Sequence, residues 1–295
     1  MQDLVSVVTL GSVYLLFALG MSITWGTIDI LNFAHGSVFM FSAFSASLVL
    51  EQRTLGLVPV LLIGVAVGAL MSVLIQVVAF EQIIRRAKDR RTAEMQILIG
   101  GIGVAIIPLA IAQHHTQSNP FGLNASSFDV STISLAGLRV TNIQALTVLL
   151  ALALWAAAAV WLRRSRQGLA LRAIGVDAQT AALMGVDRRR LALVTMAVSG
   201  GMAGLSGVLF TYSLGAITAE SGDTLLVKAF ACIILGGVGS MLGVAFGAYL
   251  LAAAEVVILT QTNGSWVEAV SFGLIFLVLL VRPAGVFGRK EVRRT

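Results

Sequence analysis

Residues 188–213 read "RRRLALVTMAVSGGMAGLSGVLFTYS", in which three arginines precede 23 residues without a charge. A run of about 20 apolar residues can cross the hydrocarbon core of a bilayer as a helix. Arginines beside such a run favour its cytoplasmic side. The glycines within the run let a neighbouring helix approach closely. This stretch therefore predicts a membrane-spanning helix that is anchored at a cytoplasmic start.

The rest of the chain has the same character. Of its 295 residues, 58% are hydrophobic and 12% are charged, and the mean hydropathy is +0.94. Soluble domains have roughly 45–50% apolar and about 25% charged residues. We therefore predict an integral membrane protein: an all-α, polytopic helix bundle that forms one transmembrane domain over residues 1–295. The length allows about eight or nine spans of about 20 residues each.

The apolar segments give approximate bounds for these spans. The second is the least regular, because "GTIDILNFAHGS" (26–37) at its start is polar and indicates a broken or re-entrant helix as an alternative to a regular one. No soluble domain and no clear internal repeat is visible. The predicted spans lie near 4–25, 31–50, 58–80, 95–113, 142–162, 191–213, 224–240, 242–260 and 267–282.

The basic residues predict the orientation. Segments 85–91, 163–190 and 282–294 hold 17 of the 20 lysines and arginines. Because cytoplasmic loops carry this excess, all three segments are expected inside. The loop 113–141 contains only Arg139 and is expected outside, and nine spans then place the N-terminus outside. This distribution accounts for the net charge of +6 better than nucleic-acid binding does.

Glycines four residues apart recur inside the spans. Small residues at this spacing let helices pack closely in lipid, where the hydrophobic effect does not hold them together. We predict close packing, with a pathway-lining or hinge role as the alternative. The pairs are Gly64 and Gly68, Gly200 and Gly204, and Gly243 and Gly247. The single cysteine, Cys232, excludes a disulfide within the chain and reads as a small buried hydrophobe.

Two ionisable residues lie inside predicted spans, Lys228 and Glu255. Such residues usually face protein or water, because a charge at the bilayer centre costs about 2.5–3.5 kcal/mol. If the two helices form a hairpin near Ser240, Lys228 lies 12 residues before the turn and Glu255 lies 15 after it. Their depths then differ by roughly 4–5 Å, which a lysine side chain can span. We predict a structural ion pair in the outer half of the bundle, with a substrate contact as the alternative.

The segment "DILNFAHG" (29–36) places Asn32 and His35 three residues apart, on one face if the segment is helical. Their role is either packing at a kink or lining a pathway. No metal site is predicted, because His114 and His115 lie together in the outer loop without a second cluster of ligands.

The polar insert at 163–190 contains "VDAQTAALMG" (176–185), which predicts a short amphipathic helix. Asp177 can cap its start and Gly185 can end it. Ala181, Leu183 and Met184 are predicted to form an apolar side. A helix that lies on lipid usually carries Trp, Phe or several Leu there. A small, alanine-rich side favours a groove in another protein, with a helix on the membrane surface as the alternative.

No catalytic motif accompanies these features. The chain lacks GxxxxGK[ST], HExxH and GxSxG, so we predict neither ATP hydrolysis nor any other enzyme activity by this chain. A stand-alone channel or secondary transporter is an alternative, with Glu255 as its one candidate coupling carboxylate. An intramembrane enzyme is a further alternative, but no paired catalytic residues support it.

Four stretches together carry a resemblance to a known family. The chain resembles the permease subunits of branched-chain amino-acid ABC importers, and looks most similar to the first permease of the usual pair. The stretches are "GSVYLLFALGMSITWGTIDILNFAHGSVFM" (11–40), "LRAIGVDAQTAALMGVDRRRLALVTMAVSGGMAGLSGVLF" (171–210), "LLVKAFACIILGGVGSMLGVAFG" (225–247) and "LVRPAGVFG" (280–288).

The resemblance implies an ATP-driven importer in a bacterial inner membrane. Its other components would be a second permease, two ATP-binding cassette subunits and an external substrate-binding protein. The chain would hold no cofactor, because the partner subunits bind ATP. The loop matching 172–190 would dock on an ATPase, and the carried-over residues there are Asp177, Ala181, Met184, Gly185 and Arg188.

The resemblance also implies a substrate pathway near "NFAHG" and "LIGGIG". The predicted pathway residues are therefore Asn32, His35, Gly36, Gly100 and Gly101. The chain departs from the family pattern at Ser37, where an acidic residue is common, and in "LIGGIG", where a Thr-Ile-Gly run is common. The implied activity is alternating-access import of branched-chain or related hydrophobic amino acids. Urea, short amides and aromatic acids are the alternative substrates.

Overall fold

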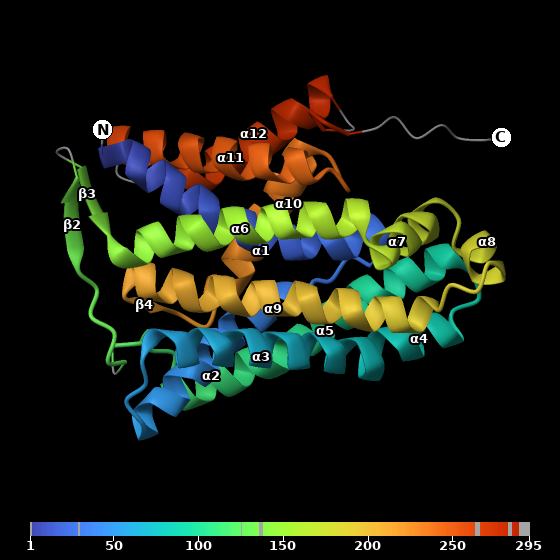
Figure 1. Cartoon of the computed structure of the whole chain (residues 1–295), viewed down its shortest axis with the longest axis horizontal. Helices are drawn as coiled ribbons and strands as arrows, with labels where there is room; N and C mark the ends of the chain where they lie inside the picture. The colour runs from blue at the N-terminus through green and yellow to red at the C-terminus, as the bar shows by residue number, and fades with distance from the viewer. Residues whose placement is uncertain are drawn as a thin grey trace.

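The computed structural model describes residues 2–28, 30–124, 126–135, 138–262, 266–282 and 285–288. Its long helices run back and forth along one axis, and most of the connections lie at the two ends (Figure 1). The helices are α1 (Gln2–Ile28), α2 (His35–Gln52), α3 (Leu57–Ile75), α4 (Glu81–Arg86), α5 (Arg90–Thr116), α6 (Asn142–Arg164), α7 (Arg166–Val176), α8 (Ala178–Leu183), α9 (Arg188–Leu214), α10 (Ser221–Gly236), α11 (Met241–Gln261) and α12 (Val267–Val281).

The nine predicted spans all fall on helices, but three of these helices are short or polar. The segments long and apolar enough to cross a membrane are α1, the continuous run Leu57–Arg86, α5, α6, α9 and α11, six among the described residues. α2 has 18 residues, including His35, Glu51 and Gln52. α10 has 16 residues and α12 has 15, or about 24 and 22 Å at 1.5 Å per residue. The count of eight or nine spans is therefore not confirmed.

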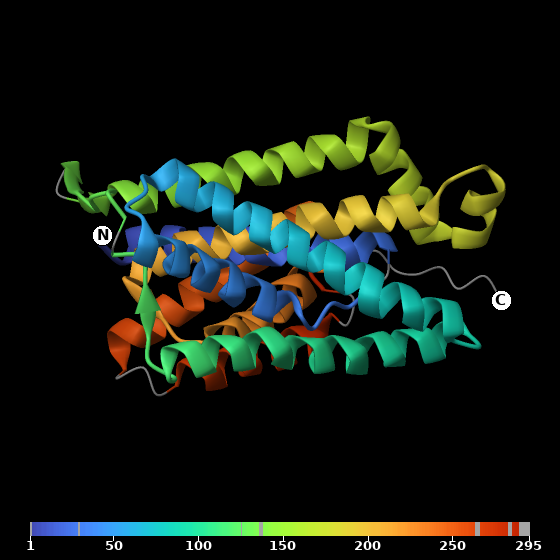
Figure 2. The ribbon, with the colours of Figure 1, turned by 90° about the horizontal axis from the view of Figure 1, so that it is seen from below.

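α1 and α9 form the centre of the bundle. Most of the residues in their apolar windows are buried, whereas α3, α5 and α6 bury under a third of theirs. α1 packs against α6, α9 and α11, and α9 packs against α2 and α3. Figure 2 shows α5 and α6 on opposite sides of this centre. The outer helices expose large apolar side chains such as Leu62, Ile106 and Leu149, as a lipid-facing surface does.

The glycine pairs sit where helices touch, so the prediction of close packing is confirmed. A Cβ atom placed on Gly68 would lie 2.2 Å from the carbonyl oxygen of Gly200, and one on Gly204 would lie 2.0 Å from that of Gly64. α3 and α9 therefore meet backbone to backbone. Gly243 and Gly247 of α11 approach α10 in the same way, and Cys232 is fully buried at this contact.

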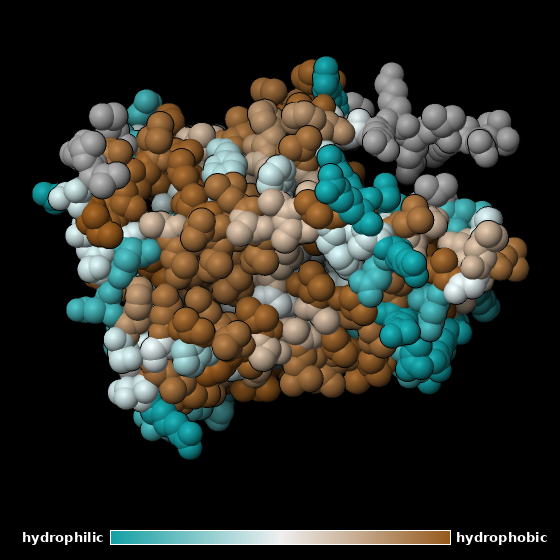
Figure 3. Space-filling model, viewed as in Figure 1, coloured by the Kyte–Doolittle hydropathy of each residue, from teal (hydrophilic) through white to brown (hydrophobic). Residues whose placement is uncertain are grey.

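The two ends of the bundle differ in chemistry. One end, called the hairpin end here, carries the start of α1 and the antiparallel strands β2 (Thr132–Leu135) and β3 (Leu138–Thr141) (Figure 1). There β1 (Phe121–Gly122) also pairs with β4 (Ala216–Ile217). The opposite end, called the basic end, carries α4, α7 and α8 and the described arginines of segments 85–91 and 163–190. A broad hydrophobic belt separates the polar ends (Figure 3).

The α3–α4 run is continuous but irregular. Residues Gln76–Phe80 form a π-helical turn, η1, between α3 and α4. Such turns are rare and occur mostly as single-turn interruptions of α-helices, frequently at functional sites. The turn places Gln76 and Phe80 inside the bundle, where both are buried.

A break separates α1 from α2, so the irregular reading of the second predicted span is the correct one. α1 ends at Ile28, α2 begins at His35, and residues 30–34 are not helical; Asp29 lies outside the described residues. Asn32 therefore does not share a helical face with His35. Its side-chain oxygen instead accepts a hydrogen bond from the backbone N–H of Ala34 at 3.0 Å.

Candidate functional site

The polar insert at the basic end folds as the short helix α8. Asp177 accepts hydrogen bonds from the backbone N–H and the hydroxyl of Thr180, which is the predicted cap. Gly185 has φ of +84°, a left-handed conformation that glycine adopts without strain. The helix therefore begins and ends at the predicted residues.

The predicted apolar side of α8 is split between two faces. Ala181 is 5% exposed and packs inward, whereas Leu183 is 87% and Met184 81% exposed. The prediction of one alanine-rich side was therefore wrong, because Ala181 is used for packing within the chain. Two large flexible apolar side chains, Leu183 at the end of α8 and Met184 directly after it, are exposed at the basic end.

An ion pair that the sequence did not reveal joins the start of α9 to α4. Arg189 lies 3.0 Å from the carboxylate of Glu81, which also binds Arg85 one helical turn further along α4. Glu81 is largely buried, with 11% of its side chain exposed, whereas Arg85 and Arg189 have 60% and 61% of theirs exposed. Arg188, the predicted coupling residue, is exposed and has no ion pair among the described residues. Sequence spacing cannot find a pair 108 residues apart.

His35 is fully buried at the first position of α2. Its Nε2 donates to the carbonyl oxygen of Phe17 on α1 at 3.2 Å, and its ring stacks on the Phe17 ring with centroids 4.7 Å apart. Its Nδ1 has no hydrogen-bond partner in the described part of the chain. His35 therefore holds α2 against α1 with one nitrogen and leaves the other unmatched.

The three predicted pathway glycines lie at contacts between elements. A Cβ atom on Gly36 would lie 2.4 Å from the carbonyl oxygen of Gly222, so Gly36 permits the contact of α2 with α10. Gly100 faces Ile83 of α4, and Gly101 lies beside Phe33 and Phe80. The α5 glycines thus bring the α1–α2 break and the turn η1 to the same part of the bundle.

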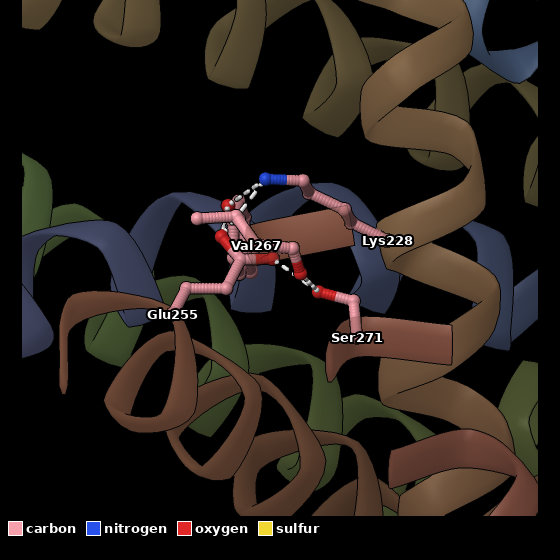
Figure 4. A network of polar contacts seen from close by, with 5 residues as sticks. Lys228, Glu255, Val267 and Ser271 are labelled. Carbon is pink, nitrogen blue, oxygen red and sulfur yellow. Dashed lines mark hydrogen bonds and ion pairs between the residues drawn. The ribbon is translucent and has the colours of Figure 1, made fainter. Parts of the chain in front are cut away.

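Lys228 and Glu255 form an ion pair, with Nζ 2.8 Å from Oε2 (Figure 4). Tyr14 lies between them: its hydroxyl accepts from Lys228 at 2.8 Å and donates to Glu255 at 2.6 Å. Ser271 Oγ lies 2.9 Å from Glu255 Oε1 and also 2.9 Å from the carbonyl oxygen of Val267. We call Tyr14, Lys228, Glu255 and Ser271 the ionic network.

The ionic network joins one helix each from four parts of the chain: α1, α10, α11 and α12. Glu255 is 2% exposed and Lys228 is 17% exposed at the side chain. Every side-chain polar atom of these four residues has a partner. Such matching is what makes a buried ion pair tolerable, because each charge has lost its contact with water.

Charged groups outside the spanning segments form local hydrogen bonds. At the hairpin end, the Gln113 amide donates to Glu220 at 2.6 Å and holds the pKa of that carboxyl below its ordinary value. At the basic end, hydrogen bonds from Thr92 lower the pKa of Asp89, which caps α5. Among the described residues, no group of three or more His, Cys, Asp or Glu side chains is arranged to hold a metal ion.

Comparison with known proteins accounts for this architecture. Residues 4–279 match the model of a family described as the permease component of the branched-chain amino acid transport system. The chain belongs to this family. The resemblance that the sequence motifs carried is thereby confirmed, and the chain is a multi-pass membrane permease.

Two named relatives match the whole chain, and a third matches part of it. The high-affinity branched-chain amino acid transport system permease protein BraD of Pseudomonas aeruginosa is 31% identical over 303 aligned positions, which cover 100% of this chain and 97% of BraD. The corresponding LivH of Escherichia coli K12 is 29% identical over 309 positions, with the same coverage. The autoinducer 2 import system permease protein LsrC of Salmonella choleraesuis matches only 37% of this chain, at 32% identity. No solved structure matches.

Proposed function

We propose that this chain is the membrane-spanning permease subunit of an ATP-driven importer that moves branched-chain or related hydrophobic amino acids inward by alternating access. Membership of the permease family and the names of the full-length relatives support this proposal. The chain works as a single transmembrane domain over residues 1–295 in a bacterial inner membrane. It crosses that membrane nine times, with α2, α10 and α12 as short crossings and the basic end in the cytoplasm.

The observation that carries the proposal is the exposed pair Leu183, the last residue of α8, and Met184, which follows it. Two large apolar side chains at a charged, water-facing end call for a protein surface to cover them. We assign this surface to one of two ATP-binding cassette subunits, which bind the ATP, so that the chain itself needs no cofactor. A second permease and an external substrate-binding protein complete the assembly, and nucleic acid has no part in it.

A connected set of contacts supports transmission from α8 into the bundle. Only residues 184–187 separate α8 from α9, and Asp187 caps α9 by accepting from the backbone N–H of Arg190. α9 is joined to α4 by Arg189 and Glu81, and to α3 by the glycine contacts. Closure of the ATPases would therefore move α9, α3 and α4 as one unit. This movement would change the relative populations of the outward-open and inward-open states.

The docking role of α8 is tested by Leu183→Glu in the full complex. A buried, unpaired carboxylate would weaken the interface, so we expect the ATPase subunits to stop co-purifying and ATP-dependent uptake to fall. Ile133→Glu on β2 adds the same charge to an exposed apolar residue at the opposite end and should leave the ATPases bound. Retention of the ATPases by Leu183→Glu would contradict this role of α8. Uptake by vesicles that hold no ATPase would contradict the whole proposal and favour the stand-alone transporter.

The substrate is tested separately by competition. ATP-dependent uptake of labelled leucine should be reduced by excess isoleucine or valine, and should not be reduced by urea, a short amide or an aromatic acid. Stronger competition by urea, a short amide or an aromatic acid than by isoleucine or valine would support the importer but change its substrate class.

A further inference from the structure

Six buried side chains on three neighbouring elements have a polar atom without a hydrogen-bond partner in the part of the chain that the structure describes. Each of the six residues is at most 4% exposed. They lie on the α1–α2 break and the start of α2, on α3 with η1, and on α9. We call them the polar seam: Asn32, His35, Ser72, Gln76, Thr195 and Ser199.

Contacts at two glycines bring two members of the seam, His35 and Ser72, to the same part of α9. A Cβ atom on Gly20 of α1 would lie 2.8 Å from the Ser199 carbonyl oxygen and 3.2 Å from Cε1 of His35. A Cβ atom on Gly200 would lie 2.2 Å from Oγ of Ser72. Because Ser199 and Gly200 are adjacent, His35 and Ser72 both lie beside this segment of α9.

The seam continues from this point toward the basic end. Gln76 follows Ser72 by four residues on the run that ends at Arg86, and Thr195 precedes Ser199 by four residues on the helix that starts at Arg188. Residues four apart lie on one helical face. The unmatched groups of these two helices therefore extend from the middle of the bundle toward α4 and the start of α9.

Most other buried hydroxyls in the same helices are matched, although Tyr212 at the far end of α9 and Ser22 on α1 also lack a partner among the described residues. Ser42 on α2 and Thr211 on α9 donate to carbonyl oxygens of their own helices at 2.7 and 2.8 Å. Ser206, two turns from Ser199 on α9, donates to the carbonyl oxygen of Val13 at 3.3 Å. Unmatched buried groups are rare in native proteins, and each one calls for an explanation.

We propose that the polar seam lines the inward half of the route taken by the zwitterionic head of the amino acid, an inference that rests on the proposed function. The seam carries no ionised Asp, Glu, Lys or Arg side chain. Its hydroxyl, amide and imidazole groups donate and accept hydrogen bonds, so they match both an ammonium and a carboxylate. Neutral groups bind such a head more weakly than charged groups would, and weak binding allows release into the cytoplasm.

The packing of α9 explains why the seam opens at the basic end. In its other half, α9 is held to α2, since a Cβ atom on Gly207 would lie 2.2 Å from the Phe39 carbonyl oxygen. α2 starts only at His35, so the half of α9 from Arg188 to Ser199 lies beyond the start of α2. Movement of this half with α3 and α4, away from α1, exposes Thr195 and Ser199.

Cysteine labelling of the reconstituted complex tests the proposal. In a Cys232→Ala background, Ser199→Cys and Thr195→Cys are treated with a small, water-soluble methanethiosulfonate in nucleotide-free and vanadate-trapped states. A minor state usually holds 0.1–10% of the population, so we expect reaction rates to differ by about tenfold or more between the two states. Leucine should slow the reaction. Ser206→Cys and Ser42→Cys are the matched controls, equally buried serines with bonded hydroxyls, and should stay unreactive.

Equal and negligible reactivity of Ser199→Cys, Thr195→Cys and Ser206→Cys in both states, with uptake intact, would overturn the seam and leave the proposed function standing. Failure of ATP-dependent uptake in the unsubstituted complex would overturn the proposed function itself. Thr195→Cys gives the same readout at a second position if Ser199→Cys does not assemble.

Discussion

The ionic network and the polar seam are both polar and both buried, but only the first has its hydrogen-bonding groups matched. In the network, Lys228 and Glu255 form an ion pair, and the Tyr14 and Ser271 hydroxyls make the remaining hydrogen bonds to it. The seam contains no Asp, Glu, Lys or Arg side chain, and six of its polar atoms lack partners among the described residues. Matched charges favour a contact between helices that stays fixed. Unmatched neutral groups favour a surface that contacts a ligand in another conformation of the protein.

Breaking the ionic network should have the largest effect. Lys228→Met or Glu255→Leu leaves one buried charge unpaired, which costs about 3–5 kcal/mol. We expect low yield and a lower melting temperature of the purified complex for each single variant. The charge-swapped pair Lys228→Glu with Glu255→Lys should recover part of the loss. Two single variants with the stability and uptake of the original protein would show that the pair is not a structural joint.

Separating α3 from α9 should have the next largest effect. Gly68→Leu forces a side chain against the backbone of Gly200, and overpacking of this kind costs about 1–3 kcal/mol. Gly103→Leu on α5 is the control, because no atom lies within 4 Å of its added Cβ. Melting temperatures in detergent should fall for the first variant only. Equal values would mean that the contact between the two helices is not tight in the protein.

Removing single hydroxyls should distinguish the seam from the matched serines by the sign of the change in thermal stability. Ser206→Ala loses a hydrogen bond to α1, at a cost of about 0.5–1.5 kcal/mol. Ser199→Ala removes an unmatched group and should be neutral or stabilising. Thermal unfolding of both variants in the same detergent gives the comparison. A larger loss for Ser199→Ala than for Ser206→Ala would show that Ser199 has a partner after all.

The ion pair of Arg189 with Glu81 should matter more for coupling than for stability. Arg189 is 61% exposed at its side chain, and exposed pairs contribute about 0–1 kcal/mol. Arg189→Gln should therefore change the melting temperature little while uptake per ATP hydrolysed falls severalfold. Arg190→Gln, on the next residue, is the control for charge at this end. An unchanged ratio of uptake to hydrolysis would limit the pair to a structural role.

The smallest effect should come from Glu220 and Gln113 at the hairpin end. The hydrogen bond lowers the pKa of Glu220 below its ordinary value of 4.5. The hydrogen bond stabilises the folded protein at every pH above the ordinary pKa. This stabilisation is lost as the pH falls through the lower pKa that Glu220 has in the folded protein. Since Glu220 is largely exposed, the contribution is well below 1 kcal/mol. Unfolding measured between neutral pH and the folded pKa should lose slightly more stability in the original chain than in Gln113→Leu.

The sequence predicted the helices well, because apolar length and glycine spacing act locally. The cap at Asp177, the end at Gly185 and the reach of Lys228 toward Glu255 follow from spacing along one segment or one hairpin. Arg189 with Glu81 and the contact of Ser72 with Gly200 do not, because their partners come from distant helices whose rotation only the packed bundle fixes. Ala181 was misassigned for the same reason: periodicity shows an apolar side without showing what covers it.

The backbone contact between α3 and α9 also has a consequence for biosynthesis. α3 ends at Ile75, and the glycines that it meets follow at 200 and 204, so α6 enters the membrane before α9 exists. During that interval, the narrow face of α3, with Ser72 beside it, must be covered by lipid, by the insertion machinery or by a temporary neighbour. If synthesis stops before residue 200, the chain lacks the glycines of α9, and the contact between α3 and α9 cannot form. Such fragments should be degraded readily by membrane proteases.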